Sequence, residues 1–567
     1  MKHDLIIRNA TIIDGSGHPA VTGDIAIADG KVVAVGEITG SATRTIDAAG
    51  LAVAPGFIDH HTHYDAQICW DPLLTPSSWH GVTTVVLGNC GLGVAPCKPD
   101  RRHVAIDDLV IIEGMPRSAI EAGLDWQWES FPEYMQAVTN NGTGINVGFL
   151  APITPFRHYV MGDDAIERPA NEQEQQQIGD LLSETFAAGA LGFATSKLPV
   201  DVGYKGKPVA SRIASTPELE GYARRLSSAG GGTIQIALIS ETGKLSDYET
   251  DLLDRLLTAS NGPVVWLCLH TDNNDPDLPL RTLAENDALI QRGAVPEVCC
   301  RPLIMQFNLN SPFTFAHLDC FGPVFLMSTA EKIVQFKDPE FRQNFRQQLA
   351  EPGLISGNIW PYIRVQSSSL DSQQSLIDQT LASIATERGT DPLDLLLDLG
   401  IEAELNIDFI FAATNNHEAQ IGKLLADPRT TIGLSDGGAH ADMLCDAGYA
   451  TYTLGRYTRE LGVMSLEQTI KRLTADQAEL FGISNRGLIK PGYAADLVLF
   501  DPDSVGSPKT PKWADDLPGG NRRMITRPTG IAAVLVNGEL LFEQGEYSGA
   551  LPGQRIVAER GRNITSS

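Results

Sequence analysis

The chain lacks any excess of positive charge. Its 567 residues carry 43 Lys and Arg against 70 Asp and Glu, which gives a formal net charge of −27. Nucleic acids and anionic membrane surfaces attract basic proteins, so this balance argues against both as partners. We predict a small-molecule partner, and the composition leaves a homo-oligomer open.

Long apolar runs are also lacking. No uninterrupted apolar stretch is long enough to span a bilayer, which takes about 20 residues as a helix. The N-terminal sequence MKHDLIIRNATIIDG carries charge within its apolar run and has neither a long apolar region nor a cleavage site for secretion. We therefore predict no signal peptide and a cytoplasmic location.

Cysteine is sparse and forms no pattern typical of disulfides. In a large chain without a secretion signal, such thiols are expected to stay reduced and to pack as small apolar side chains. The adjacent pair Cys299-Cys300 is predicted to serve packing. The eight cysteines are Cys69, Cys90, Cys97, Cys268, Cys299, Cys300, Cys320 and Cys445.

Both ends of the chain read as short β-strands within an otherwise ordinary globular composition of 43% hydrophobic and 20% charged residues. Apolar residues alternate with polar ones, and Gly or Asp-Gly marks the turns. Examples are DIAIADGKVVAVG near the N-terminus and IAAVLVNGELLFEQG near the C-terminus. Because chain termini often lie together, we predict that residues 1–54 and 486–567 form one small β-sandwich domain.

Residues 55–485 alternate strand-like and helix-like segments. The strand candidates are GVTTVVLGN, GINVGFLAP, ALGFATS, GTIQIAL, PVVWLCLH, DFIFAAT and TTIGLSD, and the helix candidates include NEQEQQQIGDLLSETFAAG and SLEQTIKRLTADQAELFG. Repeated β-then-α order implies a parallel sheet, and this number of units predicts a (β/α)8 TIM-like barrel with its site at the C-terminal ends of the strands. The irregular segment 301–370 is predicted to shape the pocket, as loops on rigid scaffolds often do.

One stretch organises the rest: APGFIDHHTHYD at residues 54–65. Its apolar part is typical of a buried strand, and successive side chains on a strand alternate faces. His61 and His63 therefore point the same way, while His60 points away. Two imidazoles on one face at the end of a strand form half of a transition-metal site. The alternative is local hydrogen bonding, which the density of histidine here disfavours.

Two further candidates follow later strands. Cys90, in GNCG, can reach a metal as a thiolate, which favours zinc over magnesium or calcium; the alternative is a buried structural thiol. Asp436, in SDGGAH, suits a general acid/base that faces a metal-activated water; the alternative is a turn or helix-capping aspartate. Position after a barrel strand favours the chemical reading for both.

Four more residues are candidates, and for three of them alternatives stay open. His270 ends the segment PVVWLCLH and could be a metal ligand, a substrate contact or a structural residue. His440 is a candidate for orienting substrate or an oxyanion. Lys197, in GFATSK, could meet a substrate carboxylate or bridge metals in carbamylated form, although a solvated lysine is the simpler reading. His80 is predicted to pack at a helix end.

Taken in order, these motifs resemble the amidohydrolase superfamily. PGFIDHHTH, GNCG, GLSDGGAH and GLIKPGYAADLVLFDP are similar to its first-strand metal pair, second-strand ligand, last-strand aspartate and terminal sandwich strand. GVTTVVLGNCGLGVAP and the late DLPGGNRRM resemble more narrowly the D-aminoacylase branch, the N-acyl-D-amino-acid deacylases. The resemblance covers nearly the whole chain.

The resemblance implies a zinc-dependent hydrolase of an N-acyl bond, with an N-acyl-(D-)amino acid as the expected substrate. It implies that His61, His63 and Cys90 bind zinc and that Asp436 acts as ligand and general acid/base. The branch also has a histidine at the end of strand five and another at strand six. The strand-five segment GGTIQIALISETG contains none, and His270 fits strand six loosely, so one or two zinc ions per chain are expected.

Two other functions remain open beside this one. The same scaffold could hydrolyse a cyclic amide, an imide or a lactone, because function belongs to the site and not to the fold. A non-catalytic relative that keeps the fold for assembly is the third reading. The metal-binding residue types that are present disfavour it.

Overall fold

A parallel barrel forms the centre of the molecule. The computed structural model describes residues 2–351, 353, 355–440, 446–508 and 511–558. Eight strands pair in the order β16-β12-β11-β10-β9-β8-β7-β6. Beyond the last strands, His63 N donates to Gly437 O at 2.7 Å, which joins the two ends of the sheet. The predicted (β/α)8 barrel is confirmed. Its strands are β6 (Phe57–Asp59), β7 (Val82–Leu87), β8 (Asn146–Pro152), β9 (Gly192–Ser196), β10 (Thr233–Ala237), β11 (Val264–Leu267), β12 (Ala294–Val298) and β16 (Thr431–Ile432).

One strand predicted for the barrel lies outside it. The segment DFIFAAT forms β15 (Ile407–Thr414), but β15 lies in a separate antiparallel sheet and not in the barrel. The barrel strand that the sequence analysis missed is β12, with the sequence AVPEV. Pro296 has no backbone N–H to donate, and Glu297 interrupts the apolar run, so β12 has neither the composition nor the alternation typical of a strand.

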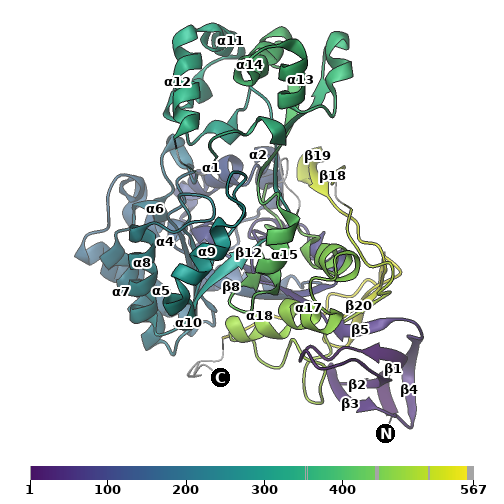
Figure 1. The fold of residues 1–567 in the computed structure, drawn as a ribbon. Helices are drawn as coiled ribbons and strands as arrows, with labels where there is room; N and C mark the ends of the chain where they lie inside the picture. Colours follow the sequence, from purple (N-terminus) through teal and green to yellow (C-terminus); the bar gives the residue numbers. More distant parts are fainter. Residues whose placement is uncertain (1, 352, 354, 441–445, 509–510, 559–567) are drawn as a thin grey trace.

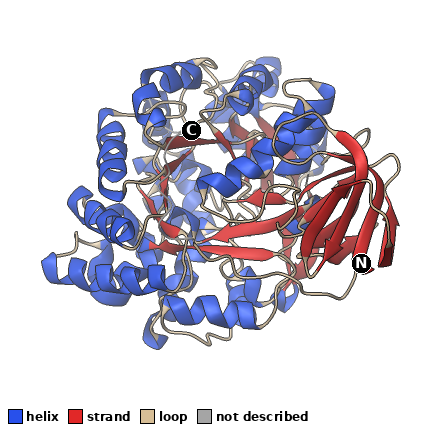
Figure 2. Cartoon of the chain, turned by 90° about the horizontal axis from the view of Figure 1, so that it is seen from below, coloured by secondary structure: helices blue, strands red, loops and turns tan. Residues whose placement is uncertain are grey.

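Helices cover the outside of the barrel (Figures 1 and 2). The helices α5 (Glu172–Ala187), α7 (Thr216–Ser228) and α8 (Asp247–Ser260) each begin with a capping box, in which an Asn or Ser side chain and a Glu three residues later satisfy free N–H groups. The other helices of the barrel are α1 (Arg102–Ile112), α2 (Arg117–Gly123), α3 (Phe131–Asn140), α4 (Ile153–Met161), α6 (Ala210–Ile213), α9 (Leu278–Glu285), α10 (Asp287–Gln291), α15 (Glu418–Ala426) and α16 (Tyr449–Tyr452), with a π-helix at Thr453–Glu460.

The amphipathic segment SLEQTIKRLTADQAELFG is divided into two helices, where the sequence predicted one. These are α17 (Leu466–Leu473) and α18 (Ala475–Leu480), and Thr474 between them has φ −134° and ψ −82°. The Thr474 hydroxyl donates to Ile470 O at 2.7 Å, which satisfies a carbonyl at the end of α17. Hydrophobic period alone does not detect such a break.

The two ends of the chain share one sheet, as predicted. Strand β17 (Leu497–Phe500) pairs antiparallel with β5 (Ala52–Pro55), and β5 pairs with β1 (Lys2–Ile12). This sheet has its own apolar core, separate from that of the barrel. Its other strands are β2 (Val21–Ala28), β3 (Lys31–Gly36), β4 (Ser41–Asp47), β20 (Ile531–Val536), β21 (Glu539–Glu543) and β22 (Glu546–Tyr547). Figure 1 shows this layer beside the barrel, with the N-terminal strands in purple.

A third unit lies at the opposite side of the barrel, at the top of Figure 1. Its antiparallel sheet β13-β15-β14 and four helices enclose a Phe- and Leu-rich core of their own. The irregular segment 301–370 is therefore part of a folded insertion and not a long loop. Its elements are β13 (Leu303–Phe307), α11 (Thr329–Lys337), α12 (Pro339–Ala350), β14 (Ile363–Ser368), α13 (Leu381–Arg388) and α14 (Pro392–Glu402), together with β15.

The C-terminal part of the chain also touches the barrel. The hairpin of β18 (Lys512–Leu517) and β19 (Asn521–Ile525) lies near α2, and Ile556 N donates to Val147 O on β8 at 2.8 Å. None of the helices within the described residues is long and apolar enough to cross a membrane.

Candidate metal centre and cavity

A cavity of about 170 Å³ opens at the C-terminal ends of the barrel strands. Its floor carries His61 and His63 from the segment after β6, Cys90 from the segment after β7 and Asp436 from the segment after β16. The folded insertion contributes aliphatic side chains such as Met305, so the prediction that segment 301–370 shapes the pocket is confirmed. Barrel and insertion together enclose the space where predicted site residues meet.

His61 and His63 lie on the same side of the chain, as the strand alternation predicts. Their ring centroids are 5.4 Å apart, and both rings line the cavity. His60 points away from it, toward Phe481 at a ring distance of 5.0 Å. The segment after β6 stays extended because Thr62 forms a parallel β-bridge with Gly437.

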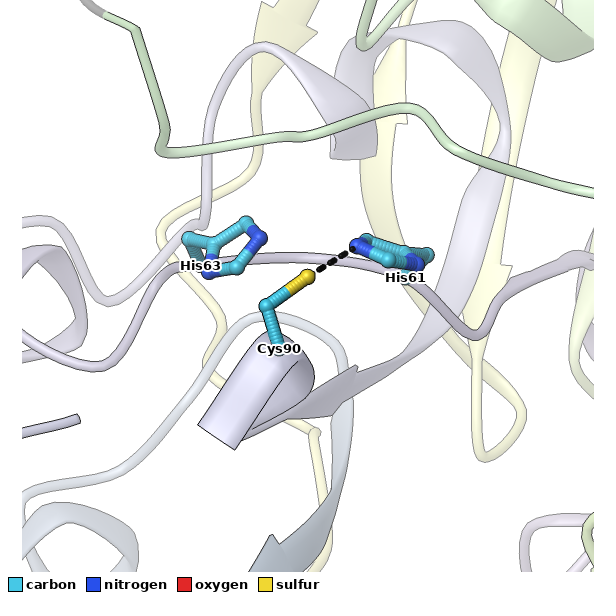
Figure 3. Close-up of side chains that lie close together, drawn as sticks. All are labelled: His61, His63 and Cys90. Atoms are coloured by element: carbon cyan, nitrogen blue, oxygen red, sulfur yellow. Dashed lines mark hydrogen bonds between the residues drawn. The ribbon is translucent and has the colours of Figure 1, made fainter. Parts of the chain in front are cut away.

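Cys90 enters the cavity from a tight turn. It has φ 54°, and Gly88 before it has φ 89°. A Cβ on Gly88 would lie 2.1 Å from Leu150 O, so only glycine fits there. The turn places Cys90 Sγ 3.4 Å from His61 Nε2, and Figure 3 shows the sulfur between the two imidazoles.

The three side chains form a donor group suited to a metal ion. One donor atom each from His61, His63 and Cys90 lies within 4.8 Å of the others. Asp436 Oδ1 lies 3.4 Å from His61 Nε2 and 3.7 Å from His63 Nε2. Two imidazoles, a thiol and a carboxylate around one point match the preferences of zinc.

Carboxylates behind the two imidazoles fix their orientation. His61 Nδ1 donates to Glu297 Oε2 at 2.9 Å, and His63 Nδ1 lies 3.3 Å from Glu113 Oε1. Each contact occupies Nδ1 and leaves Nε2 facing Asp436. Such carboxylate–histidine pairs set the tautomer that a metal-binding imidazole needs. The arrangement therefore fits a resident metal ion.

Burial and neighbouring charges shift the pKa values of Glu297 and Cys90. Burial alone would raise the pKa of Glu297, but the charges of His61 and His60 reverse the effect and hold it well below its usual range. Glu297 is fully buried, and His60 Nε2 lies 2.9 Å from its second oxygen. Burial raises the pKa of the Cys90 thiol, so the thiolate requires a cation beside it.

Gln235 lies on β10, the fifth barrel strand, whose segment contains no histidine. Gln235 on β10 accepts a hydrogen bond from Cys90 N at 2.7 Å through Oε1, and its Nε2 lies 4.0 Å from Cys90 Sγ. Its amide therefore holds Cys90 in place. A neutral amide so engaged is a weaker metal donor than an imidazole.

The remaining predicted residues have different surroundings. His270 lines the cavity, and its Nδ1 lies 2.9 Å from Thr414 Oγ1 on the insertion; burial lowers the pKa of His270 to about 4. His440 also lines the cavity. The Lys197 ammonium donates to Arg212 O at 2.8 Å and to Ala214 O, and Lys197 does not line the cavity. His80 is buried at the end of a short 3-10 helix, which confirms its packing role.

Sequence reasoning missed Glu297, Glu113 and Gln235. Glu297 had a readable signal, because a glutamate inside the apolar run AVPEVCC is buried only with a partner. The partners lie far away in sequence, so the run by itself does not name them. The described cysteines are all free, as predicted, and Cys445 lies outside the described residues.

Comparison with known proteins agrees with this geometry. Residues 44–287 and 354–542 match the Amidohydrolase family. The D-aminoacylase of Alcaligenes xylosoxydans xylosoxydans is 28% identical over 98% of this chain and 97% of its own length. The N-acyl-D-aspartate deacylase of the same organism is 28% identical over 98% of this chain and 95% of its own.

A solved structure extends the likeness to three dimensions. The N-acyl-D-glutamate deacylase from Bordetella bronchiseptica, complexed with zinc and a phosphonate inhibitor that mimics the tetrahedral intermediate, is 26% identical. It superimposes with a TM-score of 0.67 and covers 98% of this chain and 100% of its own. The family match, together with the fold and the cavity, shows that the chain belongs to the amidohydrolase family.

Proposed function

We propose that this protein is a metal-dependent hydrolase that cleaves an N-acyl amide bond in a small molecule. The observation that carries the proposal is the donor group of His61, His63 and Cys90 within 4.8 Å, with Asp436 beside it at the mouth of the barrel. The related deacylases act on N-acyl bonds, and one of them was solved with zinc.

Zinc is the proposed metal, held by His61, His63 and Cys90. Zinc bound there would supply Lewis-acid chemistry, which polarises a carbonyl and lowers the pKa of water. Asp436, whose Oδ1 lies 3.4 Å from His61 Nε2, would be a further ligand as well as the proposed acid/base. One ion is the stoichiometry we propose, because the strand-five segment GGTIQIALISETG contains no histidine. His270 is the additional donor that a second ion would need.

Asp436 is the proposed general acid/base. Its Oδ1 accepts a proton from the attacking water as the water oxygen bonds to the amide carbon. It then gives the same proton to the leaving nitrogen as the carbon–nitrogen bond breaks, so a carboxylic acid and an amine result. The location of Asp436 beside both imidazoles supports this role, and its backbone φ of 47° suits Asp or Asn.

Metal content tests the proposal first. Elemental mass spectrometry of the purified protein should give about one zinc per chain, and Cys90→Ser and His61→Ala should each lower it. Cys320→Ser, at a half-buried cysteine in the insertion, is the matched control and should keep zinc. A native protein that binds no metal after incubation with zinc would reject the proposal.

Activity tests the role of Asp436. Asp436→Asn preserves the shape and the left-handed backbone preference but removes the proton acceptor. We expect it to retain zinc and to lose about 100- to 10,000-fold in kcat for amide hydrolysis. An active Asp436→Asn enzyme would assign the proton transfer to another group.

A further inference from the structure

We infer that the amide hydrolysed in this cavity is uncharged and largely apolar, and specifically that it lacks the free carboxylate of an N-acyl-amino acid. This inference rests on the proposed amide hydrolysis and narrows its substrate class. It is carried by the charges that line the cavity and its surroundings.

The lining offers no cation to a substrate carboxylate. Within the described residues, no lysine or arginine lines the cavity. The segment 441–445, which the structure does not describe, reads ADMLC and contains no basic residue. A carboxylate moved from water into an enclosed space needs a paired cation or several hydrogen bonds to offset the lost hydration.

The walls of the cavity are mainly aliphatic. Side chains from the barrel loops and from the insertion meet around the donor group, among them Leu92, Ile112, Ile239, Met305, Ile355 and Leu434. Such walls gain free energy by covering an apolar acyl chain or an alkylamine. They offer nothing to an ionised group.

The charged residues that line the cavity are acidic. Glu113, Asp201 and Asp436 reach it, and Asp436 is the proposed general base. Glu113 contacts His63, and Asp201 accepts a hydrogen bond from Ser196. Added negative charge from a substrate would therefore meet like charges, and apart from the proposed metal ion no lysine or arginine of the described lining would face it.

Lys197, which adjoins Leu198 in the chain, and Arg212, which contacts Asp201, are engaged elsewhere. Lys197 donates to the backbone carbonyls of Arg212 and Ala214, and Arg212 Nη1 donates to Asp201 O at 3.0 Å. Burial lowers the pKa of Lys197 to about 8, which weakens it further as a fixed positive charge. The predicted contact of Lys197 with a substrate carboxylate therefore gains no support from its position.

A hollow next to the cavity is lined by the same sign of charge. This hollow has a volume of about 310 Å³, and Ile355 lines both it and the cavity. The charged side chains of this hollow are Asp319 and Glu351. With a net charge of −27 for the whole chain, the field around the site disfavours anions and adds to the effect of the lining.

A matched pair of substrates tests the inference on the zinc-loaded, full-length enzyme. N-acetyl-D-leucine and N-(3-methylbutyl)acetamide share the acyl group and the side-chain carbons and differ by the carboxylate. We expect kcat/KM for acetate release to be at least about 100-fold higher for the uncharged amide. N-(4-aminobutyl)acetamide, which is cationic, should also react more slowly, because the aliphatic walls do not offset the lost hydration of its ammonium group. Preference for either charged amide would overturn the inference.

Adding a positive charge to the cavity wall tests the same inference from the side of the protein. Met305→Lys places a cation on the wall of the cavity with a side chain of similar length, and Met305→Gln is its neutral control. Met305→Lys should raise the ratio of kcat/KM for N-acetyl-D-leucine over the uncharged amide by about 10-fold relative to Met305→Gln. Leu303→Lys, on the same strand, repeats the test if the first variant unfolds. An unchanged ratio in folded variants would contradict the inference.

Binding separates this inference from the proposed function. Calorimetry with the same pair should detect the uncharged amide and not the carboxylate, whether or not turnover occurs. Binding of the uncharged amide without hydrolysis of any amide would reject the proposed reaction and keep the inference. Tighter binding of N-acetyl-D-leucine, or binding of neither amide, would reject the inference.

Discussion

Among single residues, Glu297 contacts several parts of the site at once. Its carboxylate is fully buried between His60 and His61. It also accepts a hydrogen bond at 3.1 Å from the backbone N–H of Leu434, two residues before Asp436. A single buried group thus orients one proposed ligand and the backbone that carries the proposed base. A buried charge is retained only where its partners surround it this closely.

Glu297→Gln should weaken zinc binding while keeping the side-chain shape. Gln keeps an acceptor for His61 Nδ1 but removes the negative charge that makes the imidazole a stronger donor. We expect zinc affinity to fall by about 10- to 100-fold, measured by competition with a chelator.

The control for this change is Glu218→Gln, which removes another fully buried carboxylate, paired with Arg157 far from the donor group. It should lower the melting temperature and leave zinc affinity unchanged. Equal zinc affinities for Glu297→Gln and the native protein would show that Glu297 does not act on the metal site.

At the scale of elements, one buried carboxyl connects α1 to the loop beside the cavity. Asp108 on α1 accepts a hydrogen bond from Tyr204 N at 2.7 Å, and a Cβ on Gly203 would lie 2.1 Å from its oxygen. Burial raises the pKa of Asp108 to about 7, in spite of the hydrogen bond from Tyr204. The folded protein therefore binds a proton here that the unfolded chain releases near its ordinary value of 3.8.

The pH dependence of stability follows from that difference. The stability associated with the protonated carboxyl is complete below about pH 4 and is lost as the pH rises through about 7. Asp108→Asn stays neutral and keeps an acceptor for Tyr204 N. It should stabilise the protein at pH 8, on the order of 2–4 kcal/mol, and have little effect at pH 4.

Thermal unfolding at the two pH values measures this effect, and Asp515→Asn, at an exposed position on β18, is the control. A gain for Asp108→Asn that is the same at pH 4 and pH 8 would show that the buried charge is not its cause.

At the scale of the whole molecule, the insertion is a second folded unit that completes the cavity. Its core is separate from that of the barrel, and Phe345 is fully buried in it, with ring centroids 4.9 Å from those of Phe315 and Phe321. The donor group lies on the barrel alone, whereas the apolar walls come from both units. Metal binding and substrate binding should therefore respond differently to damage in the insertion.

Phe345→Ala should destabilise the insertion by about 3–5 kcal/mol through the cavity that it leaves. We expect faster proteolysis within the insertion and a higher KM, with zinc content unchanged. Phe149→Ala on β8, within the barrel core, is the comparison and should lower zinc retention together with global stability. Loss of zinc in Phe345→Ala would show that the two units fold as one.

The domain division 1–54 and 486–567 against 55–485 stays a prediction. The shared sheet of β5 and β17 supports it. Residues 553–558 lie against the barrel, so we propose that the strands of the sandwich end at residue 547 and that the chain after it packs on the barrel. The cytoplasmic location and the homo-oligomer also stay predictions.

Local sequence patterns were sufficient to predict the barrel, the shared terminal sheet and the proximity of His61 to His63. All three follow from local patterns: repeated strand-then-helix order, alternation along strands, and histidines two positions apart. These patterns repeat within a few residues, so no distant partner is needed to read them.

Four features became visible in the three-dimensional fold alone: the supporting carboxylates, the contact of Gln235 with Cys90, the folded insertion and the charge of the cavity. Glu297 is separated from His61 by 236 positions, and Gln235 from Cys90 by 145. Such pairs have no local signature, because strands distant in sequence become neighbours only when the barrel closes. The same closure set which side chains face the cavity, and so whether a substrate carboxylate would find a cation there.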